Sequence, residues 1–169
     1  WMRDSFENKG GLFAQLLALK KQELPNLKAL AKGQAPLAHR YPFTRATGNY
    51  LNTLLDAWLL TTGDKQWRDQ AETVIRQSIH PNDDPAERNL LDVETGWSYL
   101  VLLTSITRYL LIKAQHDEQD QNSHYARHAL IRYTRWMRKH EQPFLAQTDQ
   151  LEFPNHTWVA QDIRKAMLL

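Results

Sequence analysis

Apolar side chains fill more than one face of a long segment in the middle of the chain, residues 92–115. An amphipathic surface helix keeps a polar face, whereas Leu102 and Leu110 add apolar side chains to faces outside the main stripe. Polar residues such as Ser105 and Arg108 interrupt the run, so it is too short to span a membrane. We therefore expect one long helix, buried on most of its sides in a protein core.

The flanking segments have the one-sided apolar pattern of amphipathic helices. We expect such helices at residues 11–22, 49–61, 66–79 and 123–140, and a last one that begins near residue 157. Three long stretches that contain proline read as loops, at residues 33–47, 80–91 and 141–155. Because no segment shows the alternation of a strand, the sequence predicts an all-α fold.

Short motifs recur at the starts of the apolar helices. The letters TGNY at residues 47–50 and TGW at residues 95–97 each open one, and TW at residues 157–158 opens a third. The unit is a buried helix, a turn, a half-buried helix and a long loop, and such units bury their apolar faces only by stacking on one another. Stacked units place their long loops at one end, where binding residues commonly gather.

This pattern resembles the α/α-toroid proteins, the scaffold of six-hairpin glycosidases and polysaccharide lyases. The likeness rests on three segments: LLDAWLLTTGDKQWRDQAETVI (54–75), VETGWSYLVLLTSITRYL (93–110) and NHTWVAQDIRKA (155–166). It implies stacked αα-hairpins and carbohydrate handling at the long-loop end. A closed ring needs more hairpins than 169 residues supply, so residues 1–169 are expected to form one helical-hairpin domain. That domain is either part of a longer toroid or an open helical array.

Composition narrows the function classes. The chain has 21 Lys and Arg against 19 Asp and Glu, a formal charge of +2, which by itself indicates neither a nucleic-acid nor a membrane partner. It has no cysteine, so disulfides and thiolate chemistry are excluded. Neither a phosphate-binding glycine loop nor a nucleophile elbow is present, and we predict no cofactor.

The two ends of the sequence bear on the cellular compartment and on whether the sequence is part of a longer chain. The first residues lack an apolar core of signal-peptide length, which leaves the compartment unknown. Position 1 is not methionine, and the last residue falls within a predicted helix. We therefore expect a fragment that packs against the remainder of a longer chain.

Two glutamates that precede predicted inner helices are candidates for acid–base chemistry. Glycoside hydrolysis uses one protonated carboxyl group and one ionised carboxylate, and Glu94 with Glu152 fits that requirement in residue type. The alternative is that Glu94 interacts with the positive end of its own helix and that Glu152 is a solvated loop residue.

Lyase chemistry on a uronic acid requires instead a base and a group that neutralises the carboxylate, roles open to histidine, tyrosine and asparagine. Two tryptophans, one in each of two repeats, are sugar-stacking platforms or core residues. The candidate catalytic residues are therefore Glu94, Glu152, His156 and Tyr50, and the candidate substrate-binding residues are Asn49, Trp97, Trp158, His39, Arg40 and Tyr41.

Two further features of residues 123–140 are open to a functional interpretation. His124 and His128 have the spacing of paired metal ligands, but no HExxH glutamate accompanies them, and we predict no metal site. The basic residues of the same segment are either the solvated face of an outer helix or a surface for an anionic polymer. No nucleic-acid-binding motif accompanies them, so no nucleic acid is expected.

The leading hypothesis is a carbohydrate-active domain of the glycoside hydrolase or polysaccharide lyase type, acting on a poly- or oligosaccharide. A helical-repeat protein-interaction module without catalysis is the first alternative, and a helical accessory region is the second. The enzyme hypothesis predicts a pocket lined by Glu94, His156, Tyr50 and at least one of Trp97 and Trp158. The interaction hypothesis predicts an exposed apolar patch.

Overall fold

The computed structural model describes residues 41–61 and 63–169. The predicted helix at residues 11–22 and the candidates His39 and Arg40 lie outside these described residues. Within them the chain forms α-helices and short 3₁₀ segments and no strand, which confirms the all-α prediction. The elements are α3 (Arg45–Leu60), α4 (Lys65–Arg76), η1 (Pro85–Arg88), α5 (Val93–Gly96), α6 (Tyr99–Gln115), α7 (Gln121–His140), η2 (Phe144–Gln150) and α8 (Thr157–Ala166).

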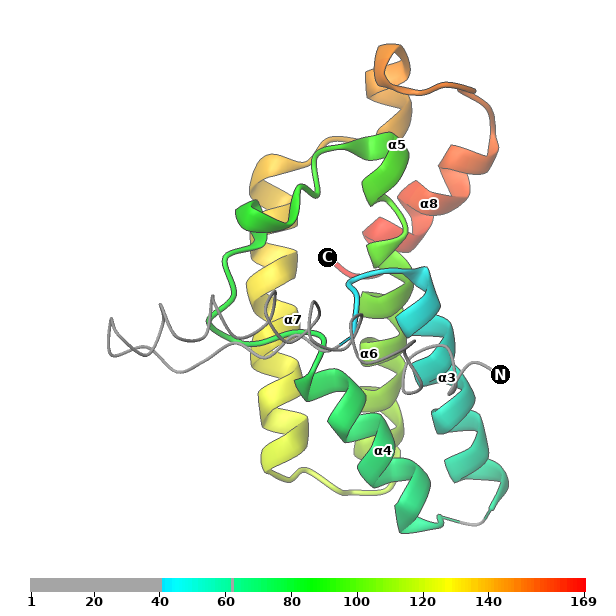
Figure 1. Ribbon diagram of the computed structural model, residues 1–169, viewed down its shortest axis with the longest axis vertical. Helices are drawn as coiled ribbons and strands as arrows, with labels where there is room; N and C mark the ends of the chain where they lie inside the picture. Colours follow the sequence, from blue (N-terminus) through cyan, green and yellow to red (C-terminus); the bar gives the residue numbers. More distant parts are fainter. Residues whose placement is uncertain (1–40, 62) are drawn as a thin grey trace, which may run out of the picture.

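Four long helices, α3, α4, α6 and α7, form the body of the described structure (Figure 1). Short turns at its lower end in that view join α3 to α4 and α6 to α7, and α6 packs against α3, α7 and α8. The long connections, which carry η1, α5 and η2, lie toward the other end. None of the described helices is long and apolar enough to cross a membrane.

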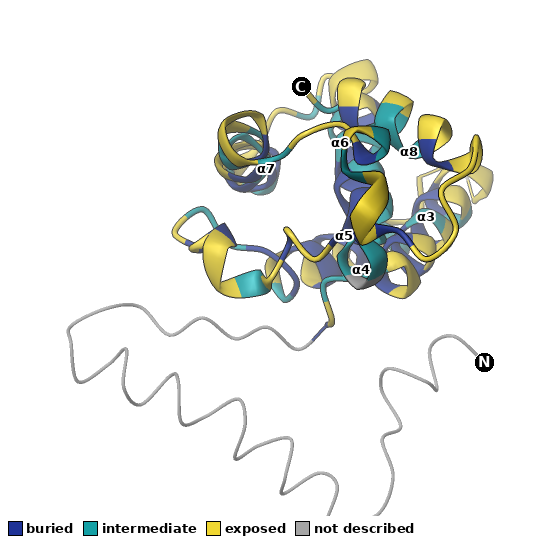
Figure 2. Cartoon of the chain, turned by 90° about the horizontal axis from the view of Figure 1, so that it is seen from above, coloured by how far each residue is buried: buried dark blue, intermediate teal, exposed yellow. Residues whose placement is uncertain are grey.

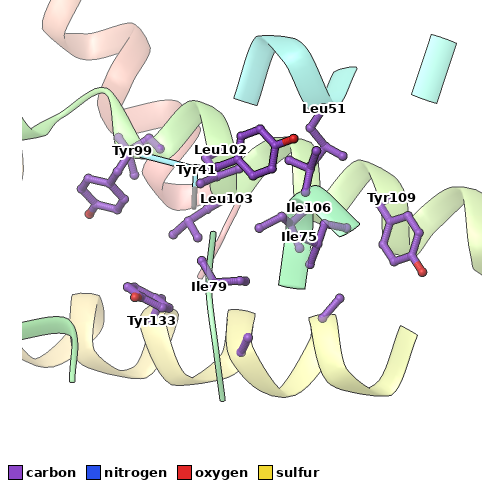
Figure 3. Packing of buried hydrophobic residues seen from close by; sticks show 14 of the residues in the cluster. Tyr41, Leu51, Ile75, Ile79, Tyr99, Leu102, Leu103, Ile106, Tyr109 and Tyr133 are labelled. Atoms are coloured by element: carbon purple, nitrogen blue, oxygen red, sulfur yellow. The ribbon is translucent and has the colours of Figure 1, made fainter. Parts of the chain in front are cut away.

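Helix α6 is enclosed on almost all sides, as its sequence predicts. From Tyr99 to Leu110 every residue is buried or half-buried. Leu102, Leu103 and Ile106 lie among side chains from α3 and α4 in the core, with α7 on the other side (Figure 3). Seen from above, the buried positions of the helices face one another and the exposed ones face outward (Figure 2). The hydrophobic core is therefore organised around α6.

The prediction of one continuous helix over residues 92–115 is wrong near its start. The chain forms the short helix α5, turns at Trp97 and Ser98, and resumes as α6. Gly96 ends α5, and glycine is a weak helix former because it loses the most backbone freedom on folding. The amides of Leu100 and Val101 bond three residues back, to the carbonyls of Trp97 and Ser98.

Close contact between α3 and α6 depends on Gly48. A Cβ atom at this position would lie 2.7 Å from the backbone nitrogen of Leu102 and 2.7 Å from the backbone carbon of Val101. The Ser105 hydroxyl donates a hydrogen bond of 2.9 Å to the Gly48 carbonyl across the same interface. The two glycines of the repeat thus have different roles, because Gly48 lies inside a helix and Gly96 ends one.

A fully buried lysine joins the lower ends of the helices. The Lys113 ammonium group lies 2.6 Å from the Asp120 carboxylate, 2.9 Å from that of Glu118 and 3.4 Å from that of Glu72. The Tyr109 hydroxyl donates to Glu72 at 2.9 Å. A buried charge is tolerated only with such partners, so this network fixes α6 against α4 and the start of α7.

Candidate functional site

A small pocket lies between α5, α8 and the connection that precedes α8. Its volume is about 210 Å³. It is lined by a carboxylate, aromatic rings and uncharged polar groups: Glu94, Trp97, Phe153, Asn155, Thr157, Trp158 and Gln161. A concave site with apolar walls and a few polar groups is the usual form of a small-molecule site, and this one suits a single ring-sized group.

Two perpendicular tryptophans form the aromatic wall. The rings of Trp97 and Trp158 lie 6.1 Å apart, centroid to centroid, at 82°. Trp158 is only 8% exposed, and its indole nitrogen donates to the Phe153 carbonyl at 3.2 Å. Trp97 is half-buried, with the Arg45 guanidinium 5.9 Å from its ring centre. Trp158 is therefore fixed in the core, whereas Trp97 is the more accessible surface for a ligand.

Glu94 is the carboxylate of the pocket. It lies in the first turn of α5, is half-buried, and accepts a hydrogen bond of 3.1 Å from the backbone amide of Glu152. The contact between these two candidates therefore runs through the main chain of Glu152. Its side chain is exposed and does not line the pocket.

Asn155 and Thr157 shape the polar edge. The Asn155 side-chain oxygen accepts hydrogen bonds from the Thr157 amide at 2.9 Å and the Thr157 hydroxyl at 2.6 Å, and its nitrogen donates to the Phe153 carbonyl at 3.1 Å. These bonds begin α8 and fix the bend after Phe153. Phe153, Asn155, Thr157 and Gln161 were not among the residues predicted for the site. In the sequence, only the Asn-x-Thr spacing of Asn155 and Thr157, just before a predicted helix, indicated this polar edge of the pocket.

A buried ion pair places α8 beside the pocket. The Lys165 ammonium group lies 3.0 Å from the Glu141 carboxylate, and both side chains are almost fully buried. Glu141 also accepts a hydrogen bond from the Tyr99 hydroxyl, and Lys165 lies 3.8 Å from the ring centre of Phe144. Burial, together with the negative charge of Glu141, raises the pKa of Tyr99 far above its ordinary value. Tyr99 therefore remains a neutral donor that connects α6 to this cluster.

The other candidate residues do not line the pocket. Tyr50 is buried, its hydroxyl accepts a hydrogen bond of 2.9 Å from Gln70, and its ring centre lies 6.1 Å from that of the buried Tyr41. Asn49 and His156 are exposed. The structure thus brings together Glu94, Trp97 and Trp158, and the remaining described candidates do not line this pocket.

No protein-family model, curated protein or solved structure matches this chain. Among residues 41–61 and 63–169, no group of three or more histidine, aspartate or glutamate side chains is arranged to hold a metal ion. His124 and His128 are both exposed on α7.

Proposed function

We propose that the protein is carbohydrate-active and that the pocket between α5 and α8 binds one residue of a poly- or oligosaccharide. The observation that supports this is the placement of Glu94 beside the half-buried ring of Trp97 in a pocket of about 210 Å³. The apolar face of a sugar ring packs on an aromatic side chain, and its hydroxyl groups pair with carboxylate and amide groups.

In this proposal Glu94 is the acid–base residue of a glycoside hydrolase or polysaccharide lyase that belongs to the α/α-toroid scaffold. The contacts of α3 with α4 and of α6 with α7 support this assignment. Hydrolysis requires two carboxyl groups, and Glu94 is the one carboxylate that lines the pocket. The second group of a hydrolase therefore comes from outside this set of lining residues, whereas a lyase requires only a base and a group that neutralises the uronate.

Substitution of Trp97 tests the binding part of the proposal. We expect Trp97→Ala to weaken saccharide binding by about tenfold or more, because it removes the accessible stacking surface. The measurement is titration calorimetry with the saccharide that ranks first in a glycan panel. Trp67→Ala removes a half-buried tryptophan on α4, away from the pocket lining, and is the matched control. Equal loss in both variants, or a panel without any binder, would overturn the binding proposal.

Substitution of Glu94 tests the chemical part. Glu94→Gln keeps an oxygen that accepts the bond from the Glu152 amide and removes the ionisable group. We expect turnover of the bound saccharide to fall by about 10²-fold or more while its affinity changes little. Unchanged turnover would remove Glu94 from the chemistry and leave the pocket as a binding site.

One observation favours the second candidate function, a protein-interaction module. Val159, Ile163 and Met167 are 41%, 58% and 73% exposed and recur every fourth residue, which makes an apolar stripe along α8. In this alternative the stripe packs against another apolar helix, and no chemistry takes place. It predicts concentration-dependent association in analytical ultracentrifugation that Ile163→Gln abolishes. A monodisperse protein at all concentrations would contradict it.

A further inference from the structure

A second and larger concavity lies between α7 and the connection from α4 to α5. It shares no lining residue with the pocket between α5 and α8. Its volume is about 740 Å³, within the range of small-molecule sites. One wall consists of Pro81, Asp84 and Pro85. The opposite wall is one face of α7, with His128, Arg132, Arg135, Trp136, Lys139 and His140. We call this concavity the α7 groove.

The α7 groove has an excess of positive charge. Arg132, Arg135 and Lys139 line it together with two histidines, against the single carboxylate of Asp84. Elsewhere in the described structure several cations, among them Arg88, Lys113 and Lys165, pair with carboxylates. Helix α7 itself contains no aspartate or glutamate between residues 121 and 140. Its cations are therefore available to a ligand.

The helix dipole accounts for only part of this charge. Positive residues stabilise the last turn of a helix, and Arg138, Lys139 and His140 occupy that turn of α7. Arg132 and Arg135 precede it, and this effect does not extend so far. Like charges three and four residues apart repel one another and destabilise a helix by a few tenths of a kcal/mol per pair. An arrangement that costs stability in this way and lines a concave surface points to a bound anion.

Both walls of the α7 groove are held in place. The buried carboxylate of Asp83 accepts hydrogen bonds from the Tyr133 hydroxyl at 2.6 Å and from Arg88 at 2.9 Å. The Arg132 side chain donates to the Asp83 carbonyl at 2.9 Å, a contact that leaves its charge without a carboxylate partner. On the α7 wall, Trp136 stacks on His140, with ring centres 5.0 Å apart. The connection is therefore fixed to α7 before any ligand binds, which lowers the entropic cost of binding.

We propose that the α7 groove binds a small phosphorylated molecule, with its phosphate groups on Arg132, Arg135 and Lys139 and its organic part against Trp136 and Pro85. A phosphate ester brings close to two negative charges, which match the excess of three cations over one carboxylate in the groove, whereas a single carboxylate does not. Two sources have this chemistry, nucleotides and sugar phosphates. The proposal does not depend on the sugar pocket.

The test is titration calorimetry of the full chain with four probes: ADP, fructose 1,6-bisphosphate, inorganic pyrophosphate and adenosine. We expect ADP or the sugar bisphosphate to bind more tightly than pyrophosphate, and adenosine to bind least, because the charge and the organic part both contribute. The tighter of the first two identifies the source. Absence of saturable binding by all four would overturn the proposal.

A matched pair of variants distinguishes the groove from the general charge of α7. Arg135→Gln removes a groove cation and is expected to weaken binding of the tighter probe by about tenfold or more. Arg127→Gln makes the same change at an exposed position on the same helix outside the groove, and is expected to leave affinity within about twofold. Equal losses in the two variants would contradict a defined site. Tighter binding of a single-stranded oligonucleotide, with equal dependence on Arg127, would assign the surface to nucleic acid instead.

Discussion

At the scale of single residues, Gly48 shows that the close approach of two helix backbones can exclude any side chain larger than hydrogen. Alanine usually stabilises a helix interior by about 1 kcal/mol relative to glycine. Here the added Cβ would lie 2.7 Å from the α6 backbone, and two backbones cannot move apart as a flexible side chain can. We expect Gly48→Ala to lower the free energy of unfolding by about 1–3 kcal/mol, measured by urea denaturation. A more stable variant would contradict this close contact.

The carboxylates around Lys113 predict how stability changes in acid. A hydrogen bond from Lys113 lowers the pKa of Glu118. Partial burial acts to raise the pKa of Asp120, but hydrogen bonds from Lys113 and the Ser123 amide lower it overall. A carboxylate with a depressed folded pKa contributes stability above its unfolded pKa and loses that contribution as pH falls through the folded value. The contribution of this pair is therefore complete above about pH 4.5, the ordinary value of a glutamate, and declines below it.

Removal of the shared cation tests this pH dependence. Burial acts to lower the pKa of Lys113, but its carboxylate partners raise it above its ordinary value, so Lys113 stays charged through neutral pH. We expect Lys113→Met to lower the free energy of unfolding at pH 7 by about 2 kcal/mol and to flatten its decline between pH 5 and pH 2. Chemical denaturation at a series of pH values gives both quantities. An unchanged acid slope would show that the ion pairs do not contribute.

At the scale of elements, the periodicity of apolar residues predicted most of the helices. It did not predict the break between α5 and α6 or the course of the connection before α8. The amphipathic pattern of residues 123–140 corresponds to α7, and the apolar run corresponds to α6. The interruption at Gly96 was missed because one glycine weakens a helix without always ending it. The course of the connection before α8 depends on the pairing of Glu141 with Lys165. Charges so far apart in sequence give no local signal.

The ion pair between Glu141 and Lys165 predicts how the stability of α8 responds to mutation. Glu141→Gln leaves the Lys165 ammonium group buried without its carboxylate, and we expect the free energy of unfolding to fall by about 3 kcal/mol. Amide hydrogen exchange should accelerate in η2 and α8 more than in α3 and α4. Glu152→Gln changes an exposed carboxylate and serves as the control, with an expected change within about 0.5 kcal/mol. Uniform acceleration across all helices would contradict a local anchor.

At the scale of the whole molecule, the small aromatic pocket and the larger cationic α7 groove are separate concavities of the described structure. The sequence pointed to Glu94, Trp97 and Trp158 because repeat position placed them at one end of the helices. It also proposed Tyr50 from the same repeat, but Tyr50 is buried, accepts a hydrogen bond from Gln70 and does not line the pocket. The basic residues of α7 were visible in the sequence. The opposite wall of their groove depends on the buried Asp83, which no local pattern reveals.

We expect the pocket between α5 and α8 to bind one ring of a saccharide. The decisive measurement is a crystal structure of the protein soaked with the saccharide that ranks first in a glycan panel. We expect density for one sugar ring against Trp97, with a hydroxyl group within hydrogen-bond distance of the Glu94 carboxylate. Sugar density away from Trp97 and Glu94, or an empty pocket at a saccharide concentration that saturates binding in solution, would contradict it.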